Sequence, residues 1–322
     1  MENVLKGRSL LTLRDFSQEE ILYLLTLAKD LKQKKKAGIF EKNLLGRNIA
    51  LIFEKPSTRT RCAFTVACVD EGAHPEYLGQ NDLQLGHKES VEDTARVLGR
   101  MFDGIEFRGY KQHTVEVLAK YSGVPVWNGL TDDDHPTQAL GDLMTIDERF
   151  GQLNGIRVAY IGDGRNNVAN ALLIAASKTG MDFTICAPPS LFPKQTLVKE
   201  CCAFAGDSGG TVTILSDPKE AVRGADVIYT DVWVSMGEET GVTSERVALL
   251  EPYRVTSELM SATGKPETVF MHCLPAVHDM EVMEEVFESS ASLVFDEAEN
   301  RMHTIKAVMV ATIAVPAHKT IF

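Results

Sequence analysis

The sequence predicts an α/β fold made of two doubly wound parallel-sheet domains. Two observations support this prediction. Short, β-rich apolar runs alternate with helical stretches along the whole chain, and 322 residues suffice for about two domains at roughly 100–200 residues each. Strands that alternate with helices are typical of βαβ units, which build parallel sheets covered by helices. The composition, with 44% apolar and 24% charged residues, is that of an ordinary globular protein.

The first half of the chain contains four predicted strands separated by helices. Each strand is a short apolar run, and each helix carries apolar residues at helical spacing. Starting with a strand and alternating, the elements are expected at Ile49–Phe53, Thr60–Glu71, His74–Gly79, Val91–Met101, Gly104–Phe107, Val115–Tyr121 and Val124–Trp127, followed by a helix at Thr137–Phe150.

The second half continues the same alternation. Its strands are expected at Arg157–Ile161, Phe183–Ala187, Val212–Leu215, Val227–Tyr229 and Val269–His272, and its helices at Asn167–Thr179 and Lys194–Phe204. The polar and small residues that follow Gly237 show little periodicity, which predicts a mobile loop. A last apolar helical stripe, Asn300–Val315, ends at Pro316 and is expected to pack on one of the two domains.

The domain boundary is expected in the turn-rich segment Gly151–Gly155, which gives domains over residues 1–150 and 151–299. The last segment, about residues 300–322, is then an addition to one of them.

Charge and cysteine content exclude several classes of protein. A net charge of −12 gives no broad attraction for nucleic acid or for an anionic membrane. The first 20 residues lack a signal-peptide h-region, and the longest apolar runs fall short of a spanning helix. Six cysteines without a CxxC pair indicate reduced thiols. The sequence therefore predicts a soluble protein of the cytosol or of an organelle matrix, assigned here to the cytoplasm, with no nucleic-acid or membrane partner.

The segment after the first predicted strand has the features of a phosphate cradle. Pro56 stops the strand, Ser57 is a natural N-cap, and the next residues form the first turn of a helix, whose unpaired N–H groups attract an anion. Hydroxyls and a guanidinium group would complete the cradle, which comprises Ser57, Thr58, Arg59 and Thr60. A capped helix with two surface arginines is the alternative from these residues alone.

Three more polar residues follow later strands of the first half. Arg108 comes after Gly104–Phe107, and His135 and Gln138 come after the next strand. Ligands of open α/β sheets bind at the carboxyl ends of strands, so these side chains are expected to converge on the cradle. An arginine, a neutral histidine and an amide are donors suited to an oxygen that gains negative charge. Singly, each has a stronger structural explanation than a functional one.

Candidate residues in the second half lie in loops after strands. Asn167 opens a helix after an IGDGRNN loop that lacks the third glycine of a dinucleotide-binding motif. Asp231 and Ser235 follow Val227–Tyr229 in DVWVSMG. His272 and Cys273 are expected on opposite faces of one strand, which argues against zinc or thiol catalysis.

Five motifs resemble those of the ornithine carbamoyltransferases, and the resemblance runs along nearly the whole chain. The motifs are STRTR at Ser57–Arg61, FRGY around Arg108, HPTQ at His135–Gln138, DVWVSMG at Asp231–Gly237 and HCLP at His272–Pro275. The STRT and HPTQ motifs are shared by transcarbamoylases in general, whereas SMG and HCLP point to ornithine. The resemblance implies that the last segment packs back on the first domain.

The resemblance also implies a role for each site residue. Residues implied in carbamoyl phosphate binding are Ser57, Thr58, Arg59, Thr60, Gln84, Arg108, His135, Gln138, Cys273, Leu274 and Arg301. Residues implied in ornithine binding are Asn167, Asp231, Ser235 and Met236, and the implied catalytic residues are Arg108, His135, Asp231 and Cys273. Gln84 would reach the active site of a neighbouring subunit, which implies a homotrimer or a multiple of trimers.

The implied reaction is carbamoyl transfer from carbamoyl phosphate to L-ornithine, giving L-citrulline and phosphate, with no metal or organic cofactor. A transcarbamoylase for another acceptor is a second hypothesis, disfavoured by Met236 and Cys273. A silent sensor of carbamoyl phosphate is a third, disfavoured because every expected side chain is present.

Overall fold

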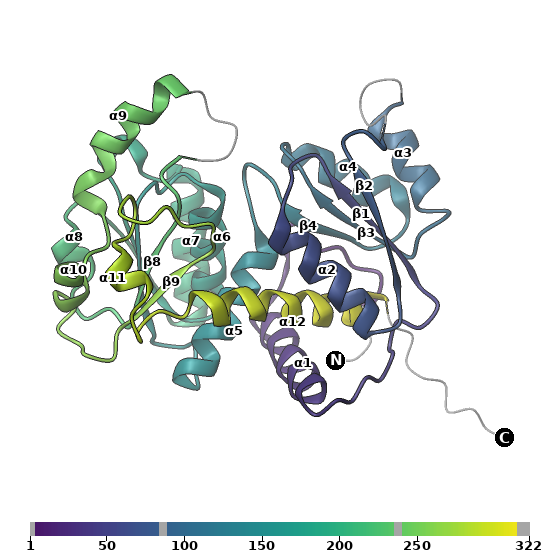
Figure 1. Ribbon diagram of the computed structural model, residues 1–322, viewed down its shortest axis with the longest axis horizontal. Helices are drawn as coiled ribbons and strands as arrows, with labels where there is room; N and C mark the ends of the chain where they lie inside the picture. Colours follow the sequence, from purple (N-terminus) through teal and green to yellow (C-terminus); the bar gives the residue numbers. More distant parts are fainter. Residues whose placement is uncertain (1–3, 84–88, 235–239, 314–322) are drawn as a thin grey trace. The chain divides into compact units, whose positions relative to one another are not determined.

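The computed structural model describes residues 4–83, 89–234 and 240–313 (Figure 1). The chain divides into two compact units, one formed by residues 1–144 with 299–322 and the other by residues 145–298. The divisions fall inside helix α5 (Pro136–Phe150) and helix α12 (Val294–Ile313). The second unit is therefore an insertion between two segments of the first.

The first unit is built around a four-stranded parallel sheet in the order β2-β1-β3-β4. Its strands are β1 (Asn48–Phe53), β2 (His74–Gly79), β3 (Gly104–Arg108) and β4 (Val126–Leu130). The helices that precede, connect or follow them are η1 (Leu13–Asp15), α1 (Gln18–Lys36), α2 (Thr58–Asp70), α3 (Val91–Leu98), α4 (Gln112–Ser122) and the start of α5. Because β1 lies between β2 and β3, the strand order reverses between β1 and β3, which is where ligands of doubly wound sheets bind.

The central strands β1 and β3 are buried because helices cover both faces of the sheet. Five of the six residues of β1, and all five residues of β3, are buried. Ala50, Ile52, Ile105 and Phe107 form one core cluster with residues of α3 and α4. Continuous burial explains why β1 is an unbroken apolar run after Asn48, whereas β3 also carries the buried polar residues Glu106 and Arg108.

Helix α12 packs against α1, α2 and α5 of the first unit, as the resemblance implied (Figure 1). Lys32 of α1 donates a 2.7 Å hydrogen bond to Asn300, and Lys306 forms a 2.6 Å ion pair with Asp70 of α2. Gly141 of α5 lies so close that an added Cβ atom would be 2.9 Å from Cγ of Arg301. These contacts place Arg301 inside the first unit.

The second unit contains a five-stranded parallel sheet in the order β7-β6-β5-β8-β9. Its strands are β5 (Arg157–Ile161), β6 (Asp182–Cys186), β7 (Thr211–Leu215), β8 (Val227–Thr230) and β9 (Val269–His272). Its helices are α6 (Asn167–Lys178), η2 (Pro189–Leu191), α7 (Gln195–Ser208), α8 (Pro218–Ala221), α9 (Thr240–Leu250), η3 (Glu251–Tyr253), α10 (Ser257–Ser261) and α11 (Glu284–Phe287). The strand order reverses between β5 and β8.

The predicted fold class is confirmed, with local corrections. The last helix begins at Val294, six residues before the expected start at Asn300. The mobile loop expected after Gly237 is wrong over α9. Glu245, Ala248 and Leu249 are good helix formers on an exposed surface, and between residues 244 and 249 no buried side chain marks the helix. The fourth strand begins two residues later and ends three residues later than expected, at Val126–Leu130 instead of Val124–Trp127.

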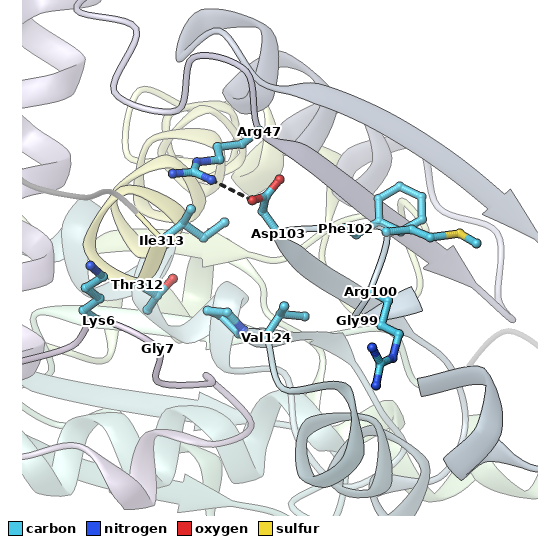
Figure 2. Close-up of a pocket in the computed structure, with 12 residues that line it drawn as sticks. Lys6, Gly7, Arg47, Gly99, Arg100, Phe102, Asp103, Val124, Thr312 and Ile313 are labelled. Atoms are coloured by element: carbon cyan, nitrogen blue, oxygen red, sulfur yellow. Dashed lines mark hydrogen bonds and ion pairs between the residues drawn. The ribbon is translucent and has the colours of Figure 1, made fainter. Parts of the chain in front are cut away.

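A cavity of about 470 Å³ lies at the amino ends of the strands of the first sheet (Figure 2). Arg47, Asp103 and Pro125, which directly precede β1, β3 and β4, help to line it. Arg47 and Asp103 form a 2.9 Å ion pair there. Ser57, Arg108 and His135 lie at the opposite, carboxyl ends of these strands. Among the described residues, none of the helices has the length and apolar character needed to cross a membrane.

Candidate active site

The predicted phosphate cradle lies where the strand order of the first sheet reverses. Ser57 caps α2, as predicted: its backbone is extended, and its side chain accepts a 3.2 Å hydrogen bond from the N–H of Thr60. Helix α2 begins at Thr58, so Arg59 lies in the first turn. The N–H groups of that turn and the helix dipole favour an anion at this point.

Thr60 brings two guanidinium groups into the cradle. Its hydroxyl accepts a 2.8 Å hydrogen bond from Nη2 of Arg301 and a 3.4 Å hydrogen bond from Nη1 of Arg108. Arg108 is only 7% exposed and Arg301 only 3%. Two buried cations that meet beside a helix N-terminus form a strong anion site, because burial reduces the screening of their charge.

His135 lies close enough to these cations to be affected by them. Burial lowers its pKa well below the usual value, and the charges of Arg301, Arg108 and Arg59 lower it further. The ring is therefore neutral at physiological pH. Its Nδ1 lies 3.4 Å from the hydroxyl of Thr137. A hydroxyl that donates to Nδ1 leaves the ring proton on Nε2, which can then donate to a ligand.

Two further residues were predicted for this half of the site, Gln138 and Gln84. Gln138 lies in the first turn of α5 and donates a 2.8 Å hydrogen bond to Asp142. Gln84 lies outside the described residues.

Asp134, next to His135, is an acid held inside the first unit. Burial raises its pKa to about 7, against the lowering effects of a hydrogen bond from Thr12, a backbone hydrogen bond from His135 and the charge of Arg14. In an unfolded chain the same group loses its proton near pH 3.9. Between about pH 4 and 7 the folded protein therefore binds one more proton than the unfolded chain, and its stability falls as pH rises.

Asparagine at position 134 should remove this pH dependence. We expect Asp134→Asn to be more stable than the unsubstituted protein at about pH 8, by up to about 3–4 kcal/mol, with the difference shrinking toward about pH 4. Urea denaturation at both pH values measures this. Asp207→Asn, at an exposed aspartate of the second unit, is the control and should not change the pH profile. Parallel profiles for Asp134→Asn and the unsubstituted protein would contradict the prediction.

Asp231 directly follows β8, which lies beside the point where the strand order of the second sheet reverses. Its Oδ2 accepts a 2.6 Å hydrogen bond from Nδ2 of Asn166, at the end of the loop after β5. Its Oδ1 accepts from Sγ of Cys273 at 3.0 Å and from its neighbour's backbone, the N–H of Val232, at 2.7 Å. Three donors thus hold the side chain of Asp231 where β5 and β8 diverge, in a position to bind a cationic ligand.

Asn166 is a site residue that the sequence analysis missed. It caps α6 by accepting a 2.8 Å hydrogen bond from the N–H of Ala169, and it also contacts Asp231. The predicted candidate, Asn167, is instead the first residue of the helix. The preference for asparagine at an N-cap was the signal that could have separated the two neighbours.

The expectation that His272 and Cys273 point to opposite faces is wrong. Strand β9 ends at His272, so side-chain alternation does not extend to Cys273. Ligand atoms of Asp231, His272 and Cys273 lie within 4.8 Å of one another and could together hold a metal ion. Nδ1 of His272, however, accepts a 2.8 Å hydrogen bond from the N–H of Leu274, and Nε2 lies 3.3 Å from Glu281. Bound to that metal through either nitrogen, the ring would lose one of these contacts.

Leu274 directly follows Cys273 and has a positive φ of 59°. Two other predicted residues of the second unit, Ser235 and Met236, lie outside the described residues.

Comparisons with known proteins agree on one family. Residues 8–148 match the family model described as the aspartate/ornithine carbamoyltransferase carbamoyl-P binding domain, and residues 154–312 match the Asp/Orn binding domain of the same family. A catabolic ornithine carbamoyltransferase from Bacillus licheniformis is 61% identical, with 96% of this chain and 97% of that protein covered. An ornithine carbamoyltransferase from Thermotoga maritima is 58% identical, with coverages of 96% and 98%.

Solved structures give the same result. The ornithine carbamoyltransferase from Pyrococcus furiosus has a TM-score of 0.93 and 47% identity over 96% of this chain and 98% of that one. An anabolic ornithine carbamoyltransferase from Campylobacter jejuni has a TM-score of 0.88 and 40% identity, with coverages of 94% and 97%.

Proposed function

We propose a residue-level mechanism for this chain from the premise that it belongs to the aspartate/ornithine carbamoyltransferase family. Its activity is that of an ornithine carbamoyltransferase: it transfers the carbamoyl group of carbamoyl phosphate to L-ornithine, giving L-citrulline and phosphate. The observation that carries this function is the 61% identity to such an enzyme over 96% of the chain, which extends across both units.

In the proposed mechanism, the first unit binds carbamoyl phosphate. The phosphate takes the cradle formed by Ser57, Thr58, Arg59 and Thr60, with Arg301 beside it. The carbamoyl oxygen takes Arg108, His135 and Gln138, and Cys273 and Leu274 contact the same group. Support comes from the two guanidinium groups that meet at Thr60 and from the neutral ring of His135, which can donate without adding charge.

The second unit is proposed to bind ornithine. Asp231 would pair with an ammonium group, and Asn167, Ser235 and Met236 would contact the rest of the molecule. Asn166 orients Asp231 for this role through its 2.6 Å hydrogen bond. Cys273 donates to the other carboxylate oxygen, so the position of the carboxylate is fixed before ornithine arrives.

The attacking amine must lose a proton before it can act as a nucleophile. With a lysine-like pKa of about 10.4, roughly one side-chain amine in 2,500 is neutral near pH 7, which corresponds to about 4.6 kcal/mol. The Asp231–Cys273 pair is the proposed proton acceptor. Attack on the carbamoyl carbon then forms an oxyanion, which Arg108 and His135 stabilise, and the C–O bond to phosphate breaks. Loss of one such donor costs about 10²–10³ in rate.

The same residues serve both directions of the reaction, because forward and reverse reactions share one transition state. This agrees with relatives that include both catabolic and anabolic enzymes.

A citrulline assay tests the acceptor. Purified protein is given carbamoyl phosphate with L-ornithine, L-aspartate or putrescine at matched concentrations, and carbamoylated product is measured. We expect product from ornithine alone. Preference for putrescine or aspartate would overturn the assignment of Asp231, Ser235 and Met236. Binding of carbamoyl phosphate without any product would favour the sensor hypothesis instead.

We also propose a homotrimer, or a multiple of trimers, in which Gln84 completes a neighbouring active site. This assembly is supported by the sequence resemblance, and light scattering on the purified protein tests it. A cytoplasmic location is proposed as well. It is supported by the six cysteines, which are all free and therefore suit a reducing compartment.

A further inference from the structure

Glu106 is a buried acid that the proposed mechanism does not use. It lies on β3, two residues before Arg108, and its side chain is fully buried. Among the described residues, neither of its carboxylate oxygens has a hydrogen-bond partner. A buried carboxylate without hydrogen bonds destabilises the fold, and an apolar residue at this position would avoid that cost.

The carboxyl group of Glu106 lies directly behind the phosphate cradle. Pairing between β3 and β4 skips Gly129, where the register shifts. A Cβ atom added at Gly129 would lie 2.0 Å from Oε1 of Glu106 and 3.2 Å from Cγ2 of Thr60. The absent side chain of Gly129 thus leaves the room that the carboxyl occupies. The same position of Gly129 also adjoins Thr60, whose hydroxyl accepts hydrogen bonds from both Arg108 and Arg301.

The positive charges of Arg108 and Arg301 affect the pKa of Glu106. Burial raises the pKa of its carboxyl well above the usual value, and the positive charges of Arg108 and Arg301 oppose that rise. On the α2 side, Cys68 is neutral, because burial, together with the charge of Glu106, raises its pKa to about 12. When ionised, Glu106 therefore acts on the same region as the cradle cations and repels an anion bound there.

We propose that Glu106 is a counter-charge that limits the affinity of the cradle for phosphate and so allows the product to leave. This inference rests on the proposed function, to which it adds a negative charge that weakens phosphate binding. A cradle of arginines and helix N–H groups that holds the phosphate of the substrate also holds the phosphate product. An opposing charge beneath it weakens both, and product release is often the slow step of an enzyme.

Glutamine at position 106 tests the charge while it keeps the shape. Calorimetric titration with inorganic phosphate, without ornithine, is carried out at about pH 7 and about pH 9. We expect Glu106→Gln to bind phosphate about tenfold more tightly than the unsubstituted protein at the higher pH. The difference between the two proteins should grow as pH rises, because Glu106 repels phosphate only when its carboxyl group has lost its proton. In turnover, kcat should fall and inhibition by phosphate should increase.

Two further variants separate charge from folding. Glu106→Asp keeps the charge and should bind phosphate about as the unsubstituted protein does, whereas Glu116→Gln removes an exposed charge of the same unit and should have no effect. Equal or weaker phosphate binding by Glu106→Gln at about pH 9, with an unchanged thermal unfolding curve, would overturn the proposal. If Glu106→Gln does not fold, the test uses Glu106→Asp. The proposal is then overturned when Glu106→Asp binds phosphate more weakly than Glu116→Gln does.

This result is independent of the citrulline assay. Should the protein make no citrulline, the proposed function fails while the phosphate titration still measures the effect of Glu106. Should it make citrulline and bind phosphate equally with Glu or Gln at position 106, the counter-charge alone fails.

Discussion

Alanine in place of Arg59 is expected to abolish measurable binding of carbamoyl phosphate. The guanidinium lies in the first turn of α2, where it opposes the helix dipole and is therefore best accommodated beside an anion. The charge of Arg59 also lowers the pKa of His135, as the charges of Arg108 and Arg301 do, so the three guanidinium groups lie near one histidine. Loss of two charge-assisted hydrogen bonds, each worth about 1.5–3 kcal/mol, weakens binding by about 10²–10⁴-fold. Calorimetric titration with carbamoyl phosphate measures the effect.

Arg61 provides the matched control for Arg59. It lies two residues further along α2, is exposed, and places its guanidinium carbon 3.8 Å from the centre of the Tyr77 ring. Arg61→Ala removes a cation–π contact and a positive charge from the same helix and should leave carbamoyl phosphate binding unchanged. Similar losses in the two variants would show that general surface charge, and not the cradle, attracts the substrate.

Alanine in place of Asp231 is expected to have the opposite pattern. Carbamoyl phosphate should bind as before, while kcat/KM for ornithine falls by about 10³-fold or more, because both the partner of the ammonium group and the proposed proton acceptor are lost. Asn166 and Cys273 would also lose the acceptor of their hydrogen bonds. Titration with each substrate, combined with citrulline assays, measures both effects.

The control for Asp231 lies at the other end of the same strand. Asp226 directly precedes β8, and its carboxylate accepts hydrogen bonds from the backbone of Arg157 at 2.9 Å and from Nζ of Lys265 at 2.6 Å. We expect Asp226→Asn to lower stability without changing KM for ornithine. If Asp231→Ala lost carbamoyl phosphate and kept ornithine, the assignment of the two substrates to the two units would be reversed.

Most of the fold was predictable because parallel strands buried on both faces are continuous apolar runs. Strands β5 and β9, which are buried in this way, have the predicted bounds, and so does the partly exposed strand β2. Strand β4 was misplaced because it contains Asn128 and Gly129, which are not typical of strands. Asn128 is buried there and donates a 3.0 Å hydrogen bond to the carbonyl of Leu11, a contact made by folding and not visible in local sequence.

The site was predictable where a local rule applied and not where distant segments meet. The cap by Ser57 follows from residue type and position, and the structure confirms it. Arg301 could not be placed in the cradle from spacing, because it lies 241 residues from Thr60, and only the resemblance indicated it. The pairing of Asn166 with Asp231 depends in the same way on which strands are neighbours in the sheet.

The insertion of one unit within another makes the cradle depend on a complete chain. During synthesis, residues 57–60 emerge from the ribosome long before Arg301, and the whole of unit 145–298 emerges between them. A chain terminated within that unit lacks both the second guanidinium at Thr60 and the Lys32–Asn300 contact. If the cradle binds carbamoyl phosphate as proposed, a truncated chain that lacks a complete second unit also binds carbamoyl phosphate weakly.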